Sequence, residues 1–261
     1  MSKEKNNSIQ SFAQKKFLLK QLIRRDFKSR YKRTALGVLW SMFSPLCFFA
    51  AQAIVFTKLL GRGEHYTAYL IIGNIIFHYF SDATTNEMFA LQANGGIISK
   101  IKVDKKIFLF SRAVSCLIHF LLTAVVMFAV VAFDHVTFHW NFLLLIFPLS
   151  CMFFMNMGIG YILSALFVFF KDTQYLYSIF TRILVYFSAI FYYTDRFPEN
   201  LQKLFYCNPV YCYIDYFRSI IIENTVPSLF VHILCAVFPI IFMLIGNLVY
   251  KLNDSKFAYY F

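Results

Sequence analysis

The strongest constraint on this chain is an uncharged run directly behind a dense basic segment. Six basic residues lie between positions 24 and 33, namely Arg24, Arg25, Lys28, Arg30, Lys32 and Arg33. The next 24 residues, Thr34 to Thr57, have no charged side chain, and about 20 apolar residues are enough for a helix to cross a bilayer. We therefore predict a first transmembrane helix over 34–57. Its basic flank would be held at the anionic cytoplasmic face, with Trp40 near that interface.

The composition indicates that this chain is an integral membrane protein. The chain is 59% hydrophobic and 20% aromatic, well above the usual content of a soluble domain. A net charge of +12 also suggests nucleic acid as a partner, but 11 of the 25 Lys and Arg residues precede residue 34. Docking on anionic lipid explains this distribution more simply, so we expect membrane lipids and no nucleic acid as partners. We expect no cleavable signal peptide, because about 33 polar and basic residues precede the first apolar run.

The amino-terminal segment, residues 1–33, is predicted to be a cytoplasmic tail that includes an amphipathic helix. Four apolar residues at spacings of seven, four and four define one helical face, which Lys16 interrupts: Phe12, Leu19, Ile23 and Phe27. A basic amphipathic helix lying in the membrane interface is the natural interpretation.

The rest of the chain, 34–261, is predicted to be one all-α transmembrane domain with six spans. After 34–57 the expected spans are 66–89, 107–133, 141–170, 174–193 and 228–250. Residues 91–106 are polar and basic and suit a short cytoplasmic helix. Residues 195–227 mix prolines with charged and aromatic residues, a pattern that permits short outer or re-entrant helices.

The positions of the basic residues predict the orientation of these spans. With both termini in the cytoplasm, 20 of the 25 Lys and Arg residues lie on the cytoplasmic side. This bias predicts a multi-pass membrane protein with both ends in the cytoplasm.

No pattern of catalytic or metal-binding residues is evident. The six histidines are scattered, and His135 and His139 are only two ligands beside an outer turn. Gly95-Gly96 is followed by Ile-Ile-Ser-Lys without the second glycine of a phosphate-binding loop, so ATP hydrolysis by that route is excluded. Two carboxylates, Asp82 and Glu87, lie within a predicted span near its cytoplasmic end. Two explanations of carboxylates at this position stay open: a functional role, or an ordinary position from which the side chain snorkels or reaches water.

Two further features of the sequence leave alternatives open. Cys207 and Cys212 share the predicted outer loop, where a disulfide is one alternative. The predicted span 174–193 has many aromatic side chains, including Tyr186, Phe187, Phe191 and Tyr192, together with Arg182. Such side chains suit stacking on sugar rings, but they also suit contact with lipid and the membrane interface.

Four segments together resemble the permease subunits of type-2 ABC exporters, most closely those that export lipid-linked polysaccharides such as O-antigen and wall teichoic acid. They are Arg24–Pro45, Asn94–Phe108, Lys171-Asp172-Thr173-Gln174, and Asn208-Pro209-Val210-Tyr211 running on to Arg218. The likeness covers nearly the whole chain. Lys171 stands where the family usually has Arg, and Val103-Asp104 stands where an aromatic-Pro pair is usual.

This resemblance implies a six-helix half-transporter that forms a homodimer with two copies of an ABC ATPase subunit. ATP and Mg would be bound by the ATPase, with no cofactor in this chain. The two permeases would enclose a channel for an undecaprenyl-diphosphate-linked glycan such as O-antigen, teichoic acid or capsule.

The resemblance also implies roles for particular residues. The six basic residues from Arg24 to Arg33 are candidates to attract the diphosphate. Trp40 and the aromatic group around Arg182 are candidates to contact the glycan. Residues that would couple to the ATPase are Asn94, Gly95, Gly96, Lys100 and Lys102.

The chain is thus predicted to transport without catalysing a bond change. One alternative is a type-2 ABC exporter of drugs or small amphiphiles. Another is a membrane-embedded glycosyl- or acyltransferase, for which Asp82 and Glu87 are the only close pair of intramembrane carboxylates.

Overall fold

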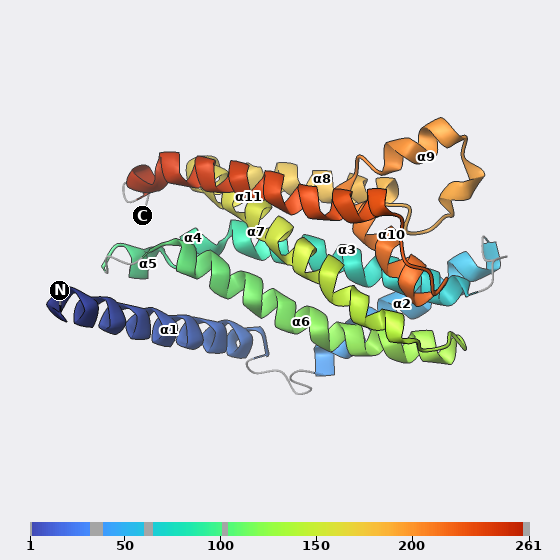
Figure 1. The fold of residues 1–261 in the computed structure, drawn as a ribbon, viewed down its shortest axis with the longest axis horizontal. Helices are drawn as coiled ribbons and strands as arrows, with labels where there is room; N and C mark the ends of the chain where they lie inside the picture. The colour runs from blue at the N-terminus through green and yellow to red at the C-terminus, as the bar shows by residue number, and fades with distance from the viewer. Residues whose placement is uncertain (1, 32–38, 60–64, 101–103, 258–261) are drawn as a thin grey trace.

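The computed structural model describes residues 2–31, 39–59, 65–100 and 104–257, in which every regular element is a helix. The helices form an elongated bundle (Figure 1). In chain order they are α1 (Ser2–Tyr31), α2 (Leu39–Leu59), α3 (Tyr66–Met88), α4 (Ala90–Ala93), α5 (Gly95–Ile98), α6 (Lys106–Phe133), η1 (Trp140–Leu145), α7 (Ile146–Phe169), α8 (Thr173–Phe187), η2 (Thr194–Arg196), α9 (Glu199–Phe205), α10 (Pro209–Ile221) and α11 (Leu229–Phe257).

The bundle has two distinct ends (Figure 1). The amino terminus of α1, the short helices α4 and α5, and the carboxyl end of α11 lie at one end. The short helix α9 and the turn that follows α6 lie at the other end. The amino terminus of α1 and the segment with α4 and α5 therefore lie at the same end of the molecule.

Helix α3 is the centre of the packing. It contacts α2, α6, α7, α8 and α10, and most of its residues are buried. The main core includes Leu70, Ile72 and Ile76 of α3 and Tyr213 and Tyr216 of α10. Burial of large apolar and aromatic side chains in the core stabilises this arrangement.

Helix α11 packs mainly on α7, at a crossing made of two glycines. A Cβ atom on Gly158 would overlap the backbone of Phe242, and one on Gly246 would overlap the carbonyl oxygen of Gly158. Small residues allow helix backbones to approach this closely in membrane proteins.

Three of the described helical segments are long and apolar enough to cross a membrane: Lys106–Phe133, Trp140–Phe169 and Leu229–Asp254. They correspond to three of the six predicted spans. The predicted helices over 34–57 and 66–89 are present as α2 and α3, and the part of 34–57 before Leu39 lies outside the described residues.

The largest departure from the sequence prediction is at 174–193. Helix α8 ends at Phe187 rather than at Tyr193, and with 15 residues it is about 22 Å long, shorter than a bilayer core. The predicted helix over 141–170 begins with the 3₁₀ turn η1, and the last helix continues past Tyr250 to Phe257. The expected short helices within 195–227 are found as α9 and α10. Asn208 and Pro209 explain the start of α10, because Asn208 Oδ1 accepts a hydrogen bond from Val210 N at 3.0 Å and proline suits the first helical turn.

Candidate functional site

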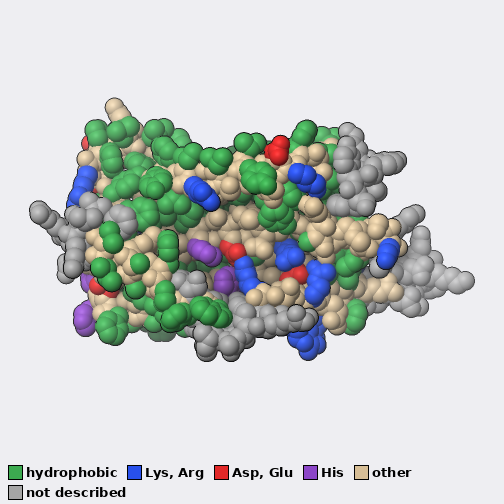
Figure 2. Space-filling view, turned by 180° about the vertical axis from the view of Figure 1, so that it is seen from behind, with side chains coloured by type: hydrophobic (Ala, Val, Ile, Leu, Met, Phe, Trp, Pro, Cys, Tyr) green, Lys and Arg blue, Asp and Glu red, His purple; other side chains and the backbone are tan. Residues whose placement is uncertain are grey.

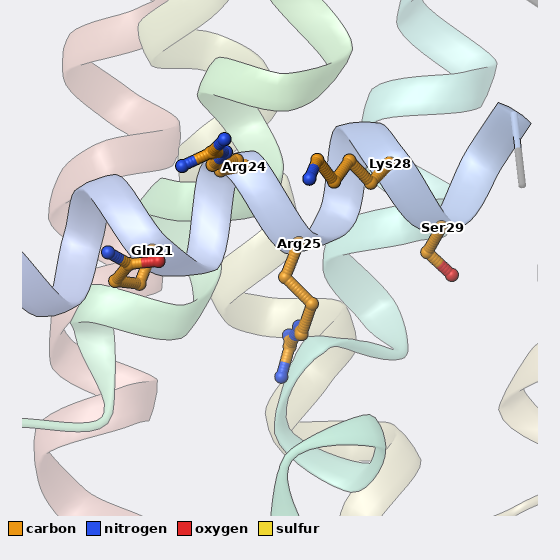
Figure 3. A pocket seen from close by; sticks show the side chains of 5 residues that line it. All are labelled: Gln21, Arg24, Arg25, Lys28 and Ser29. Carbon is orange, nitrogen blue, oxygen red and sulfur yellow. The ribbon is translucent and has the colours of Figure 1, made fainter.

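Helix α1 contains three residues of the six predicted to attract the diphosphate that line one hollow. Arg24, Arg25 and Lys28, with Gln21 and Ser29, line an open surface hollow of about 760 Å³. Figure 3 shows Arg24 and Lys28 on one side of the helix, while Arg25 points to the other side. Arg25 donates to Oδ1 of its neighbour Asp26 at 2.9 and 3.1 Å. Arg24 and Lys28 are exposed and one helical turn apart, so a multiply charged anion can meet both.

A second group of charges joins α1 to the bundle. Arg30 forms an ion pair with Asp82 of α3, and Oδ2 of the buried Asp26 lies 3.5 Å from Nε of Arg112 on α6. Figure 2 shows charged and histidine side chains gathered between hydrophobic areas in the middle of one face. These pairs hold α1 against α3 and α6, and Asp82 offsets the charge of Arg30. Lys32 and Arg33 lie outside the described residues.

A cavity of about 810 Å³ brings together three of the predicted glycan-contacting residues: Arg182, Tyr186 and Phe191. Its lining also includes several residues of α3 and, from α2 and α6, Phe48, Phe49, Gln52 and Thr123. Aromatic side chains beside hydrogen-bonding groups suit a ligand that has both apolar ring faces and hydroxyl groups.

The polar wall of this cavity was missed by the sequence analysis. Asn74, His78 and Ser81 line it from α3, at spacings of four and three that place them on one helical face. The sequence signal that could have predicted these residues is a polar stripe on one face of an otherwise apolar span.

Three other predicted contact residues do not line the cavity. Trp40 of α2 is 46% exposed and packs edge-on against Phe43 with ring centroids 5.8 Å apart. Phe187, the last residue of α8, is 62% exposed. The Tyr192 ring packs against Phe197 and Phe205, and its hydroxyl donates to the carbonyl oxygen of Tyr186 at 2.5 Å.

Comparison with known proteins decides the family. The model of the ABC-2 type transporter family matches residues 18–222 of this chain. The chain belongs to the ABC-2 type transporter family. This permease is 28% identical over 245 residues to the O-antigen export system permease protein RfbA of Klebsiella pneumoniae, covering 92% of this chain and 93% of that protein.

More distant relatives cover a similar share of the permease. It is 18% identical to the O-antigen export system permease protein RfbA of Myxococcus xanthus, over 96% of this chain and 97% of that protein. It is 22% identical to the polysialic acid transport protein KpsM of Escherichia coli, over 94% of this chain and 96% of that protein.

Of the predicted ATPase-coupling residues of the permease, Asn94 lies between α4 and α5, Gly95 and Gly96 begin α5, and Lys100 is in the turn after it. Asn94 is buried, and its side chain donates to the carbonyl oxygen of Ala90 at 2.7 Å. Gly95 is buried, whereas Gly96 and Lys100 are exposed, and a Cβ atom on Gly96 would meet only open space. The surface around Gly96 and Lys100 is accessible to a partner protein. Lys102 lies outside the described residues.

Asp82 and Glu87 do not form the acid–base pair that a transferase would need. Asp82 pairs with Arg30. Glu87 is fully buried, and its carboxyl group occupies space that the absent side chain of Gly160 on α7 leaves free. The prediction that the Glu87 side chain snorkels or reaches water is therefore wrong, because the α3–α7 contact encloses its carboxyl group.

The remaining histidine and cysteine candidates show no shared site among the described residues. No group of three or more His, Cys, Asp or Glu side chains there could hold a metal ion. His139 interacts with Thr137 rather than with His135. Cys207 and Cys212 are free, the former exposed and the latter buried beside the carbonyl oxygen of Tyr206.

Proposed function

We propose that this permease is the membrane-spanning subunit of an ATP-driven exporter that moves an undecaprenyl-diphosphate-linked cell-surface polysaccharide across the bacterial cytoplasmic membrane. The observation that carries the proposal is the cavity among α2, α3, α6 and α8, where Tyr186 and Phe191 stand beside Arg182 and the polar stripe of α3. Relatives named for O-antigen export and polysialic acid transport align over nearly their whole length. Both names specify a polysaccharide, which favours a glycan over a drug or small amphiphile.

The proposed arrangement places the end with α4, α5 and both termini in the cytoplasm. Residues 1–33 form a tail and interface helix, and 34–261 form a six-span transmembrane domain. The distribution of basic residues along the sequence supports this orientation, and Figure 1 shows the amino terminus of α1, α4, α5 and the carboxyl end of α11 at the same end of the bundle. Helices α9 and α10 would then be the outer or re-entrant helices.

The proposed transporter is a homodimer with two ATPase subunits, which bind ATP and Mg. The exposed Gly96 and Lys100 at the cytoplasmic end are available to contact the ATPase. Coupling across this surface would convert closure of the ATPase into passage of the glycan, with no cofactor in the permease itself.

The basic face of α1 is proposed to receive the diphosphate of the carrier. Arg24 and Lys28 project on one side of α1 (Figure 3), and guanidinium and ammonium groups both bind phosphate oxygens. Arg30 contributes to the positive field while it also pairs with Asp82.

The test is depletion of this protein from its bacterium, followed by fractionation of undecaprenyl-linked glycan. The proposal predicts that lipid-linked glycan accumulates on the cytoplasmic side and that surface glycan falls. If surface glycan persists and no lipid-linked intermediate accumulates, the proposed function is wrong. Increased drug sensitivity with unchanged surface glycan would instead support the small-amphiphile exporter.

A further inference from the structure

The segment that follows α8, residues 188–193, leaves the helix yet stays largely buried. Ser188, Ala189 and Ile190 are buried, with at most 1% exposure. Ala189 has a φ of 47°, in the left-handed region that costs a non-glycine residue about 1–2 kcal/mol. Without helical partners, the backbone carbonyls of this break segment need other donors, because an unpaired polar group away from water is costly.

Side chains from α3 and α10 supply those donors to four consecutive carbonyl oxygens, those of residues 189–192. Arg218 of α10 donates to Ala189 O at 3.0 Å and to Ile190 O at 3.2 Å. The Tyr66 hydroxyl of α3 donates to Phe191 O at 2.8 Å. The Tyr69 hydroxyl donates to Tyr192 O at 2.7 Å and also lies 3.2 Å from Ala189 O.

The start of the break segment is fixed from the other direction. The side-chain amide of Asn208, which also caps α10, donates to Phe187 O at 3.1 Å and to Ser188 Oγ at 3.0 Å. We refer to Tyr66, Tyr69, Asn208 and Arg218 as the carbonyl cradle. Both ends of the break segment are thus attached to the rest of the bundle.

Arg218 is itself accommodated by α3. It is 4% exposed, its guanidinium carbon lies 3.4 Å from the centre of the Tyr69 ring, and it also donates to Tyr69 O at 3.1 Å. A Cβ atom on Gly73 would overlap its Nη2 atom, so glycine at this position makes room for the guanidinium. Within the described part of the chain, its hydrogen bonds go to backbone carbonyls and none to a carboxylate.

The break segment in turn shapes the cavity. Ile190 and Phe191 form part of its wall beside Tyr186 and Arg182, and the hydroxyl of Tyr192 returns to Tyr186 O. A movement of the segment therefore moves the aromatic side chains that face the cavity.

We propose that Arg218, Tyr66, Tyr69 and Asn208 are positioning residues that hold the break segment so that Phe191 presents its ring to the transported polymer and Tyr192 keeps its hydrogen bond to Tyr186. This inference rests on the proposed function. The cradle residues do not contact the polymer themselves; they act through the backbone carbonyls of residues 187 and 189–192 and the hydroxyl of Ser188.

The first test variant removes two donors and keeps the size of both side chains. Tyr66→Phe combined with Tyr69→Phe removes both hydroxyls and keeps both rings. The matched control is Tyr213→Phe, because the buried Tyr213 hydroxyl also donates to a backbone carbonyl, that of Cys235 at 2.9 Å, but outside the break segment. Arg218→Gln is the second cradle variant, with Arg196→Gln, an exposed arginine of η2, as its control.

The first readout is the order of the break segment and does not depend on the identity of the cargo. A reporter cysteine, Tyr192→Cys, is placed in a background that lacks the exposed Cys47 and Cys207, and its labelling by a water-soluble maleimide is followed in opened membranes containing the assembled transporter. We expect labelling to be about tenfold faster in the cradle variants, because loss of a buried hydrogen bond shifts a local equilibrium by about that factor. Unchanged labelling in the double tyrosine variant would overturn the proposal.

The second readout is export in variants without the reporter. At equal membrane levels, we expect the cradle variants to lower surface glycan about tenfold and the two controls to leave it near the level of the unaltered protein. Faster labelling with export equal to that of Tyr213→Phe would also overturn the positioning role. Failure of the proposed function is recognised separately, because depletion of the unaltered protein would then leave surface glycan unchanged.

Discussion

At the scale of single residues, Glu87 is the least expected feature of the permease. The side chain is 0% exposed, and neither carboxyl oxygen has a hydrogen-bond partner among the described residues. A carboxyl group in such surroundings lowers stability, because its removal from water is not offset by a hydrogen bond or a paired charge.

Replacement of Glu87 by glutamine is therefore expected to stabilise the permease. Glu87→Gln keeps the shape of the side chain and replaces the unpaired carboxyl group by an amide that never ionises, and we expect the Tm of the purified transporter to rise by about 2–4 °C. Asp82→Asn is the matched control, since it makes the same chemical change at a carboxylate that pairs with Arg30, and it is expected to lower the Tm. A decrease for Glu87→Gln as large as that for Asp82→Asn would show that the Glu87 charge has a partner.

At the scale of helices, the close crossing of α7 and α11 depends on glycine. Gly158→Ala would place a methyl group against the backbone of Phe242, which no side-chain rotation relieves. We expect a loss of about 1–3 kcal/mol, typical of overpacking, measured as faster thermal inactivation of the assembled transporter. Gly96→Ala serves as the control, since its Cβ atom would meet open space. Equal stability of the two variants would argue against a tight crossing.

The helices also show which parts of the fold were predictable from the sequence. Apolar runs bounded by charges predicted α3 and α6 to within about one residue, because their hydrophobicity is a local property. The end of α8 was not predictable in this way. The apolar and aromatic pattern continues to Tyr193. The groups that donate hydrogen bonds to the carbonyls after the end of the helix come from Tyr66, Tyr69 and Arg218, which are far away in the sequence.

The candidate site was predictable to a similar extent. Arg182, Tyr186 and Phe191 were predicted as contact residues and line one cavity. The pairing of Arg30 with Asp82, 52 residues apart, depends on how α1 lies against α3, and no local pattern specifies this. The same holds for Glu87, whose burial follows from the small size of Gly160 on another helix.

At the scale of the whole molecule, the two ends differ in chemistry. The end with α4 and α5 has the exposed Lys100, whereas the break segment and α9 are rich in aromatic contacts, such as Tyr192 with Phe197 and Phe205. In the proposed exporter, two separate regions of the permease contact the substrate one after the other. The basic face of α1 would first attract the diphosphate, and the aromatic wall of the cavity would then contact the sugars.

Charge reversal on α1 tests the proposed role of its basic face in attracting the diphosphate. Arg24→Glu with Lys28→Glu reverses two exposed charges on one side of α1 and leaves the pairs Arg25–Asp26 and Arg30–Asp82 intact. We expect export to fall at least tenfold at normal membrane levels, because charge-assisted hydrogen bonds to phosphate contribute about 1.5–3 kcal/mol each.

The control for charge reversal is Lys16→Glu with Lys20→Glu. It makes the same charge change, at the same spacing, on exposed residues of the same helix about two turns toward the amino terminus. If the effect on export comes from general repulsion between α1 and anionic lipid, both double variants would reduce export equally. A site for the diphosphate requires the effect to be specific to Arg24 and Lys28, and surface-glycan levels at matched protein abundance distinguish the two cases.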